Sequence, residues 1–227
     1  KRLKHQNRAL KNSNKTLEEY AYIASHDLRS PLQNILSFLG LLKKTVIPKF
    51  NKTQKTYFRF VEESAERMNQ TTIDLLHYST SNNVNIKTVN TTILFQTVLG
   101  DIKAIIDENN AVIKLRKLPS EINVDENLFR LLIQNLLTNA LKFVPKGKIP
   151  KIDISYQSNK NQHIFCIRDN GIGISKKNSE NIFKIFKRLH TTKEYEGTGI
   201  GLSMCKRIVQ GHDGEIWLES EVGKGSQ

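Results

Sequence analysis

The sequence predicts a fold of class α + α/β, in which a helical hairpin dimerises into a four-helix bundle and an α/β sandwich domain follows. Apolar residues recur in steps of four and three up to about residue 82, as they do in coiled coils. Beyond residue 85, helical and alternating patterns follow one another, with glycine-rich turns between them. The polar segment 81–85 is typical of a linker, so we expect domains at 1–84 and 85–227.

The predicted hairpin consists of two long helices joined at a turn that Pro48 and Asn51 mark. Each helix carries an apolar stripe. The stripe residues are Leu3, Leu10, Leu17 and Ala24, then Leu28, Leu32, Ile35, Leu39, Leu42 and Val46, and in the second helix Tyr57, Val61, Ser64, Met68, Thr71, Leu75 and Tyr78. One such hairpin has too little core to be stable alone, so we expect a homodimer. From periodicity alone, a coiled-coil spacer would explain the same pattern.

The second part of the chain has a mixed α/β pattern. Helices are predicted at 92–108, 127–144 and 201–210, and strands at 112–115, 151–156, 163–168 and 215–219. Pro145 and Gly147 end the helix at 127–144. The apolar side of that helix is expected to pack on the sheet.

The composition excludes several classes of protein. Of the 227 residues 38% are hydrophobic, but no apolar run reaches the ~20 residues that a membrane helix needs. The formal charge of +13 suggests nucleic-acid binding, yet no base-reading motif accompanies it. We therefore expect no nucleic-acid partner and no membrane segment in this chain. Cys166 and Cys205 lack metal-ligand spacing and suit a reducing compartment, the cytoplasm.

His26 has an unusual setting on the first predicted helix. A rotation of about 100° per residue turns it away from the apolar stripe and into water. Most exposed helical histidines have no function. Here Asp27 can accept a hydrogen bond from one ring nitrogen, which leaves the other nitrogen free as a nucleophile. Pro31 removes a backbone donor one turn further on and predicts a bend beside the ring.

A polar stripe runs along the predicted helix at 127–144. Asn135, Asn139 and Lys142 fall within about 60° of one line. A solvent-facing stripe is the usual explanation for such a set. The functional alternative is that the asparagine oxygens bind Mg²⁺, which prefers oxygen ligands, while Lys142 contacts phosphate. Because neither asparagine carries a charge, the metal would be held mainly by ligands from a nucleotide.

Two glycine-rich segments follow this helix. Asp169-Asn170-Gly171 could be a hairpin turn, but a lysine-rich polar segment follows where a partner strand would be needed. Asp169 can instead accept a hydrogen bond from an adenine amino group, with Gly171 and Gly173 letting the backbone close on the ring. The segment 197–201 opens a helix, whose free amide groups favour phosphate. These segments together predict an ATP site.

In this order, the segments resemble the sensor histidine kinases of two-component signalling, and the resemblance covers nearly the whole chain. The phosphoacceptor box of that family is similar to His26-Asp27-Leu28-Arg29-Ser30-Pro31-Leu32, and its asparagine box to Asn135-Leu136-Leu137-Thr138-Asn139-Ala140-Leu141-Lys142-Phe143. Its first glycine box is similar to Asp169-Asn170-Gly171-Ile172-Gly173, and its second glycine box to Gly197-Thr198-Gly199-Ile200-Gly201-Leu202. Its phenylalanine box is similar to Ile182-Phe183-Lys184-Ile185-Phe186. The lid at 186–201 is similar to the subgroup that follows phytochrome-type and PAS-type sensors. The resemblance implies an ATP-binding domain of the gyrase and histidine-kinase type.

The resemblance also implies roles for these residues. His26 would accept the γ-phosphoryl group of ATP, and Asp27 would orient the ring and act as general base. The implied cofactors are ATP and Mg²⁺, with Asn139 and Asn135 as metal ligands. The implied nucleotide-binding residues are Asn135, Asn139, Lys142, Asp169, Gly171, Gly173, Phe183, Thr198, Gly199, Gly201 and Leu202, with Phe183 and Phe186 anchoring the lid.

Partners are implied as well. The phosphoryl group would pass to an aspartate in the receiver domain of a response regulator. A sensor domain is expected upstream, outside this chain, so the chain is expected in the cytoplasm or in the cytoplasmic part of a membrane-bound sensor. Ser30 stands where the family's phosphatase signature has threonine or asparagine, which puts phosphatase activity in doubt.

Two other functions share part of this pattern. An ATPase of the gyrase and mismatch-repair superfamily would have the nucleotide boxes without a phosphoacceptor helix. A non-catalytic dimeric scaffold would keep the fold without the chemistry. Protein labelling by ATP separates both from a kinase.

Overall fold

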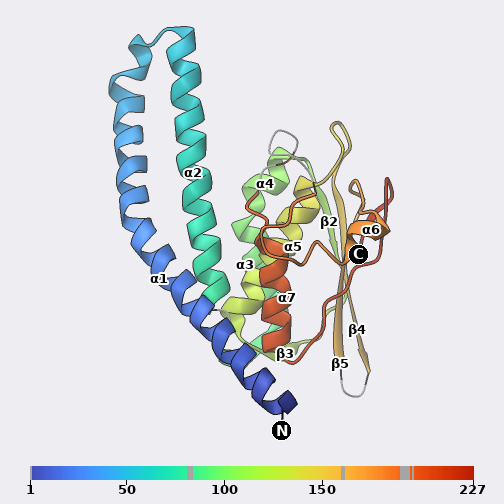
Figure 1. Ribbon diagram of the computed structural model, residues 1–227. Coiled ribbons are helices and arrows are strands. Elements are labelled where there is room, and N and C mark those ends of the chain that lie inside the picture. The colour runs from blue at the N-terminus through green and yellow to red at the C-terminus, as the bar shows by residue number, and fades with distance from the viewer. Residues whose placement is uncertain (1, 81–83, 160–161, 190–194, 196) are drawn as a thin grey trace. The chain divides into compact units, whose positions relative to one another are not determined.

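The computed structural model describes residues 2–80, 84–159, 162–189, 195 and 197–227, with side chains from residue 21 on. The chain divides into two compact units, Lys1–Thr80 and Ser81–Gln227 (Figure 1). Positions 81–83 of the predicted linker lie outside the described residues. The side chains of Leu3, Leu10 and Leu17 in the predicted stripe lie outside them too.

The first unit is a helical hairpin, as predicted. α1 (Arg2–Thr45) and α2 (Lys52–Thr80) are joined through a short 3-10 turn, η1 (Ile47–Lys49). At the start of α2, the N–H of Gln54 donates to Asn51 Oδ1 and the N–H of Asn51 donates to Gln54 Oε1, each at 2.9 Å. This reciprocal pair satisfies amides that a first helical turn leaves free, and it explains why α2 begins here.

The apolar stripe of α1 is only partly buried within one chain. Leu32 and Leu39, one heptad apart, are 3% and 8% exposed. The alternate stripe residues keep about half of their surface, with exposures of 50% for Leu28, 47% for Ile35 and 41% for Leu42. Within one chain these three side chains therefore form an exposed apolar face of α1.

The second unit is an α/β sandwich, as predicted. In its main sheet, β4 (Lys151–Asn159) lies between a parallel β2 (Val112–Leu115) and an antiparallel β5 (Gln162–Asp169). Two short antiparallel pairs are β1 (Lys87–Asn90) with β3 (Glu121–Val124), and β6 (Ser220–Glu221) with β7 (Gly225–Ser226).

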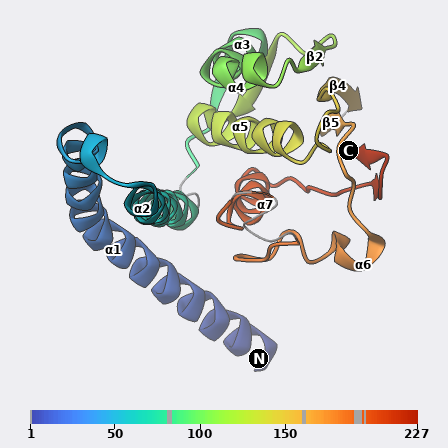
Figure 2. The same cartoon turned by 90° about the horizontal axis from the view of Figure 1, so that it is seen from above.

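The helices of the sandwich are α3 (Thr91–Asp101), α4 (Lys103–Glu108), α5 (Glu126–Lys142), the short α6 (Lys176–Ser179) and α7 (Gly201–Gly211). Figures 1 and 2 show α3, α4, α5 and α7 gathered on one side of the main sheet. α5 begins after Asp125, whose Oδ1 accepts the N–H of Leu128 at 3.0 Å. Among the described residues, no helix is both long enough and apolar enough to span a bilayer.

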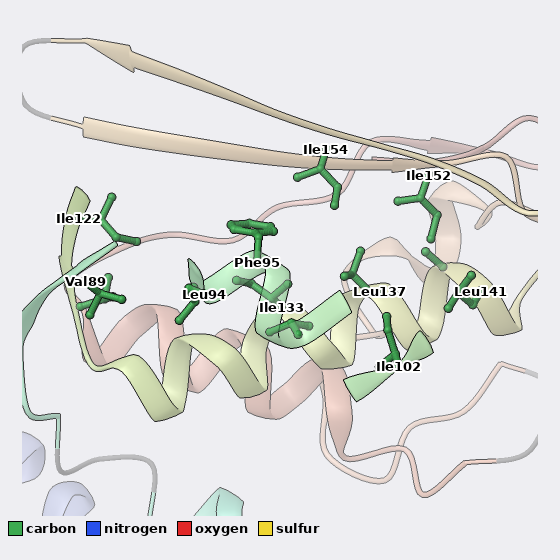
Figure 3. Packing of buried hydrophobic residues seen from close by; sticks show 13 residues of the cluster. Val89, Leu94, Phe95, Ile102, Ile122, Ile133, Leu137, Leu141, Ile152 and Ile154 are labelled. Carbon is green, nitrogen blue, oxygen red and sulfur yellow. The ribbon is translucent and has the colours of Figure 1, made fainter. Parts of the chain in front are cut away.

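The core lies between the sheet and helices α3 and α5 (Figure 3). Ile152 and Ile154 of β4 are 2% and 0% exposed and point toward the helical layer. Phe95 of α3 and Leu137 of α5 meet them from the other side, at 1% and 0% exposure. Because the apolar side of α5 is buried here, its polar stripe is turned away from the sheet.

Two predicted elements differ from the structure. The helix predicted at 92–108 is divided into α3 and α4 at Ile102, whose φ and ψ of −99° and 9° are not helical. Ile102 is 1% exposed, so the break lets this side chain enter the core. The strand predicted at 215–219 is wrong. Pairing begins only at Ser220, and in the described residues the segment before it gains just one pair of backbone hydrogen bonds, between Glu219 and Gln227.

Candidate functional site

His26 is exposed on α1, as predicted. Its side chain is 69% exposed, whereas the neighbouring Ser25 is 1% exposed, so the histidine lies on the outer face of the hairpin. His26 Nδ1 lies 3.2 Å from Asp27 Oδ1, which is the hydrogen bond that the sequence suggests. In this arrangement Nδ1–H donates to the carboxylate and Nε2 keeps its lone pair toward solvent. α1 continues through Pro31 without ending.

The polar stripe of α5 consists of half-buried side chains. Asn135 Nδ2 donates to Leu131 O at 2.9 Å, so its Oδ1 is left for another partner. That oxygen lies 2.7 Å from the position that a Cβ would take on Gly201. The Asn139 side chain makes no hydrogen bond within the described part of the chain, and its amide oxygen is therefore available to a ligand.

Segments distant in sequence meet along the C-terminal half of α5. Gly201, the first residue of α7, lies beside Asn135. Gly197 lies beside Lys142, because a Cβ on that glycine would be 2.8 Å from Lys142 Nζ. At the end of α5, Phe143 O accepts the N–H of Ile172 at 2.9 Å. The fold thus brings the asparagine segment together with both glycine-rich segments.

The Asp169 carboxylate is held by backbone groups on one side. Its Oδ1 accepts the N–H of Gly171 at 2.7 Å and that of Ser226 at 3.2 Å. Burial raises the pKa of Asp169, although these hydrogen bonds and the charge of Lys148 act in the opposite direction. Among the described residues both hydrogen bonds go to Oδ1, so Oδ2 is available to accept a hydrogen bond from a ligand.

Gly171 and Gly173 both pack against the chain itself. A Cβ on Gly171 would clash with Phe143 O, and a Cβ on Gly173 would clash with Glu221 O. From the sequence, these glycines are predicted to admit a nucleotide ring. The structure adds a different reason for them, since they let the turn after β5 approach the end of α5 and the β6–β7 hairpin.

Replacing Gly173 with alanine is expected to destabilise the protein by about 2–4 kcal/mol, because a clash is added to a strained backbone. Gly173 has φ +69°, and its Cβ would meet the backbone of Glu221. Gly147→Ala is the matched control, because φ there is +81° but nothing lies within 4 Å of its Cβ. That control should lose only about 1 kcal/mol. Denaturant unfolding measures both, and equal losses would contradict the clash.

The first turn of α7 presents amide groups that no side chain caps. The residue at the N-cap, Ile200, makes no side-chain cap, so the first-turn amides of Gly201 and Leu202 have no capping side chain. Thr198 Oγ1 lies 3.4 Å from the amide nitrogen of Ile200. Gly199 has φ +77°, and a Cβ there would lie 3.1 Å from the backbone of Phe186. Such a helix start suits an anion.

The two phenylalanines of the predicted lid have different surroundings. Phe183 is half-buried next to Ile182, and Lys206 Nζ of α7 lies 5.9 Å from its ring centroid. Phe186 is 57% exposed and has φ +60°. Phe183 therefore has the contacts of an anchor, and Phe186 does not. Residues 190–194 and 196 of the predicted lid lie outside the described residues.

The structure adds neighbours that sequence reasoning missed. The Tyr22 ring stacks on the His26 ring, with centroids 6.4 Å apart and planes inclined by 22°. The Tyr195 ring lies 5.1 Å from that of Phe143 at the end of α5. Tyr22 and His26 are four residues apart on a helix, a spacing that could have indicated the contact. No sequence signal indicates the Tyr195 contact, because it joins segments far apart in the chain.

Known proteins share this domain order. The family model described as "His Kinase A (phospho-acceptor) domain" matches residues 16–83, and that described as "Histidine kinase-, DNA gyrase B-, and HSP90-like ATPase" matches residues 124–227. Phytochrome-like protein Cph1 of Synechocystis sp. is 36% identical over 96% of this chain. The chain spans only 29% of the length of that relative.

Solved histidine kinases have the same fold. Full-length ShkA in complex with AMPPNP matches 92% of this chain and 44% of its own, with a TM-score of 0.71 and 23% identity. Histidine kinase ThkA in complex with response regulator protein TrrA matches 98% of this chain and 63% of its own, with a TM-score of 0.64 and 21% identity. At these identities the likeness concerns the fold alone.

Two family models and one relative identify the family. A phosphoacceptor domain precedes the ATPase domain, which argues against a gyrase-type ATPase that lacks such a helix. The phytochrome-like relative agrees with the subgroup that the lid predicted. The chain therefore belongs to the sensor histidine kinases and carries their catalytic core.

Proposed function

We propose that this chain uses ATP to phosphorylate its own His26 and passes the phosphoryl group to an aspartate of a response-regulator receiver domain. The observation that carries the proposal is the state of His26, whose Nδ1 is held by Asp27 while the side chain stays 69% exposed. A nucleophile must present a lone pair to the group it attacks, and Nε2 does so. Residues 1–84 would serve dimerisation and phosphotransfer, and residues 85–227 would bind ATP.

ATP would bind where the segments meet along α5. Asp169 Oδ2 would accept a hydrogen bond from the adenine amino group, because Oδ1 is already occupied by backbone N–H groups. The first-turn amides of Gly201 and Leu202, which no side chain caps, would receive phosphate oxygens. Lys142 would add positive charge beside Gly197. Thr198, Gly199 and Phe183 would shape the loop and lid over the phosphates.

The oxygen donors on α5 fit a Mg²⁺ ion that is shared with the triphosphate. Asn139 and Asn135 offer neutral amide oxygens, which this hard cation accepts. In the described part of the chain, no group of three or more His, Cys, Asp or Glu side chains could hold a metal alone. A bound Mg²⁺ would neutralise phosphate charge, and Asn139 and Asn135 would hold it on the protein side.

The transfer step is an in-line displacement at the γ-phosphorus. A bond forms from His26 Nε2 to that phosphorus, the bond to the β–γ bridging oxygen breaks, and ADP leaves. The ring becomes positively charged, and Asp27 stabilises the Nδ1 proton and then accepts it. The acceptor and the nucleotide belong to different units, so motion between the units is part of the mechanism.

The second step needs a receiver domain as partner. ThkA, a histidine kinase of the same fold, forms a complex with the response regulator TrrA, and we propose a partner of this class here. Ser30 is exposed one turn after His26, where its hydroxyl could orient water for the reverse, dephosphorylating reaction. ATP and receiver domains are cytoplasmic, so we place this chain there, downstream of a sensor domain.

A homodimer would cover the exposed apolar face of α1. Leu28, Ile35 and Leu42 are spaced by heptads and lie on one line, at 50%, 47% and 41% exposure. Heptad spacing with a second, buried set (Leu32 and Leu39) is the pattern of a helix that packs against two neighbours. The second neighbour would come from another copy, which completes a four-helix bundle.

Replacing Ile35 with glutamate is expected to turn the dimer into monomers, because the charge would be buried without a partner. The dimer dissociation constant should rise at least about 100-fold, measured by sedimentation equilibrium. Leu41→Glu is the matched control, since Leu41 is 58% exposed and points about 120° away from Ile35. A dimeric Ile35→Glu variant, or a monomeric Leu41→Glu variant, would contradict this face.

One labelling assay tests the proposed function. Incubation with γ-labelled ATP and Mg²⁺ should give a phosphoprotein that is labile in acid and stable in base, and EDTA should prevent it. ATP turnover without protein label would instead indicate a gyrase-type ATPase. Neither turnover nor label at saturating Mg-ATP would indicate a scaffold.

A further inference from the structure

The side chain of Asn170 joins the turn after Asp169 to the α5–β4 loop, residues 143–150. Asn170 Nδ2 donates to Ile149 O at 3.0 Å, and Asn170 Oδ1 accepts the N–H of Lys151 at 2.9 Å. Both ends of the amide are therefore used by the chain. A carboxylate of the same shape could make only one of the two bonds, because it cannot donate.

The same turn is bonded to the other end of the loop. Ile172 donates its N–H to Phe143 O at 2.9 Å, and Gly171 allows this approach because it has no Cβ to clash with that carbonyl. The turn that follows Asp169 is thus hydrogen-bonded to both ends of the α5–β4 loop. Because Phe143 caps α5, these bonds set the position of Asp169 relative to the polar stripe of that helix.

Lys148, in the middle of the loop, adds a charge to this arrangement. Its Nζ donates to Asn170 O at 2.5 Å. Its positive charge lowers the pKa of Asp169, against the larger effect of burial, which raises it. The other partners of the carboxylate are the backbone N–H groups of Gly171 and Ser226, which do not titrate. Lys148 is therefore the charged side chain that favours the ionised form of Asp169.

We propose that Asn170 and Lys148 are positioning residues for nucleotide recognition. Asn170 holds Asp169 where it meets adenine, and Lys148 binds the backbone of Asn170 and places its positive charge near that carboxylate. Neither side chain needs to touch the nucleotide. The inference rests on the proposed contact between Asp169 and adenine, and it makes the α5–β4 loop part of the ATP site.

Asn170→Asp tests the positioning role. The new oxygen would face Ile149 O, so the turn should shift and the dissociation constant for Mg-ADP should rise about tenfold in calorimetry. The labelling rate at saturating ATP should stay unchanged, which gives a rise in KM without a fall in kcat. Asn123→Asp is the control, because it adds the same charge on β3 and keeps the hydrogen bond from Thr88 Oγ1.

Lys148→Met tests the electrostatic role. Without Lys148 the Asp169 carboxylate should take up a proton at higher pH, so the acid limb of Mg-ADP affinity, followed from pH 8 downward, should move to higher pH. Lys148→Arg should leave the limb in place, and Lys146→Met controls for loss of a loop charge. A purely structural role would lower the melting temperature without moving the limb.

The outcomes separate this inference from the function on which it rests. Asn170→Asp with the Mg-ADP affinity of the unaltered protein, or an unmoved acid limb in Lys148→Met, would overturn the inference alone. An unaltered protein that binds no Mg-ADP would overturn the proposed function first.

Discussion

His26→Gln is expected to reduce protein labelling from γ-labelled ATP to background while Mg-ADP affinity stays unchanged. Glutamine suits an exposed helical position, so α1 and the dimer should persist. It offers no ring nitrogen with an available lone pair, and the phosphoryl group has no acceptor. The nucleotide would bind in the other unit, at Asp169 and the start of α7, which this substitution does not touch. Autoradiography and calorimetry measure the two effects on one sample.

His77→Gln is the matched control for that experiment. His77 also lies on a helix of the first unit, α2. Among the described residues, no carboxylate forms a hydrogen bond with its ring. Labelling of this variant should equal that of the unaltered protein. Label that persists in His26→Gln would mean that another residue accepts the phosphoryl group. Loss of label together with loss of Mg-ADP affinity would point to misfolding.

The hairpin could be predicted because its signal is local. Heptad spacing predicts two helices that each have an apolar side, and the structure has both helices. One chain buries only part of the α1 stripe and leaves Val61 and Met68 of the α2 stripe exposed. The division of the stripe could not be predicted. Whether Leu32 is buried within one chain while Ile35 is exposed depends on how α2 lies against α1, and both residues belong to the same stripe.

The candidate site was predictable where one segment carries its own chemistry. The hydrogen bond between His26 and Asp27 joins adjacent residues, so it could be expected from the sequence. The contacts of Gly173 and Asn170 join segments about 20 to 50 residues apart, and the sequence contains no sign of them. The glycines after Asp169 therefore suggested space for a nucleotide, although other parts of the chain also pack against them.

Strands β1 and β3 were not predicted, again because the contacts that form them join distant segments. β1 and β3 are each four residues long and are stabilised by pairing with each other across about 30 residues. The segment 215–219 has a better strand pattern than either, but it lacks a partner strand in the described residues. Pairing, which a single segment cannot report, decides which short segments become strands.

Asp169→Asn is expected to weaken Mg-ADP binding severely and, at pH 8, to leave the protein as stable as before or more stable. Asparagine Oδ1 can still accept the N–H groups of Gly171 and Ser226, so the turn should keep its shape. Nδ2 then replaces the oxygen that would face adenine, and it donates toward an amino group that also donates. Losing a charged hydrogen bond and leaving donors unpaired should weaken binding at least about 100-fold.

The stability effect has the opposite sign from most aspartate substitutions. Burial raises the pKa of Asp169, so its ionised form costs stability at any pH above that raised value. Asparagine removes this cost, and the advantage should disappear as the pH falls through the raised pKa and the unaltered protein takes up its proton.

Asp153→Asn is the control. The hydrogen bond from Arg116 lowers the pKa of Asp153, so that variant should lose stability at pH 8 and approach the unaltered protein in acid. Melting temperatures followed from pH 8 to below the ordinary pKa of an aspartate separate the two signs, and a lower melting temperature for Asp169→Asn at pH 8 would show that the buried charge stabilises the fold.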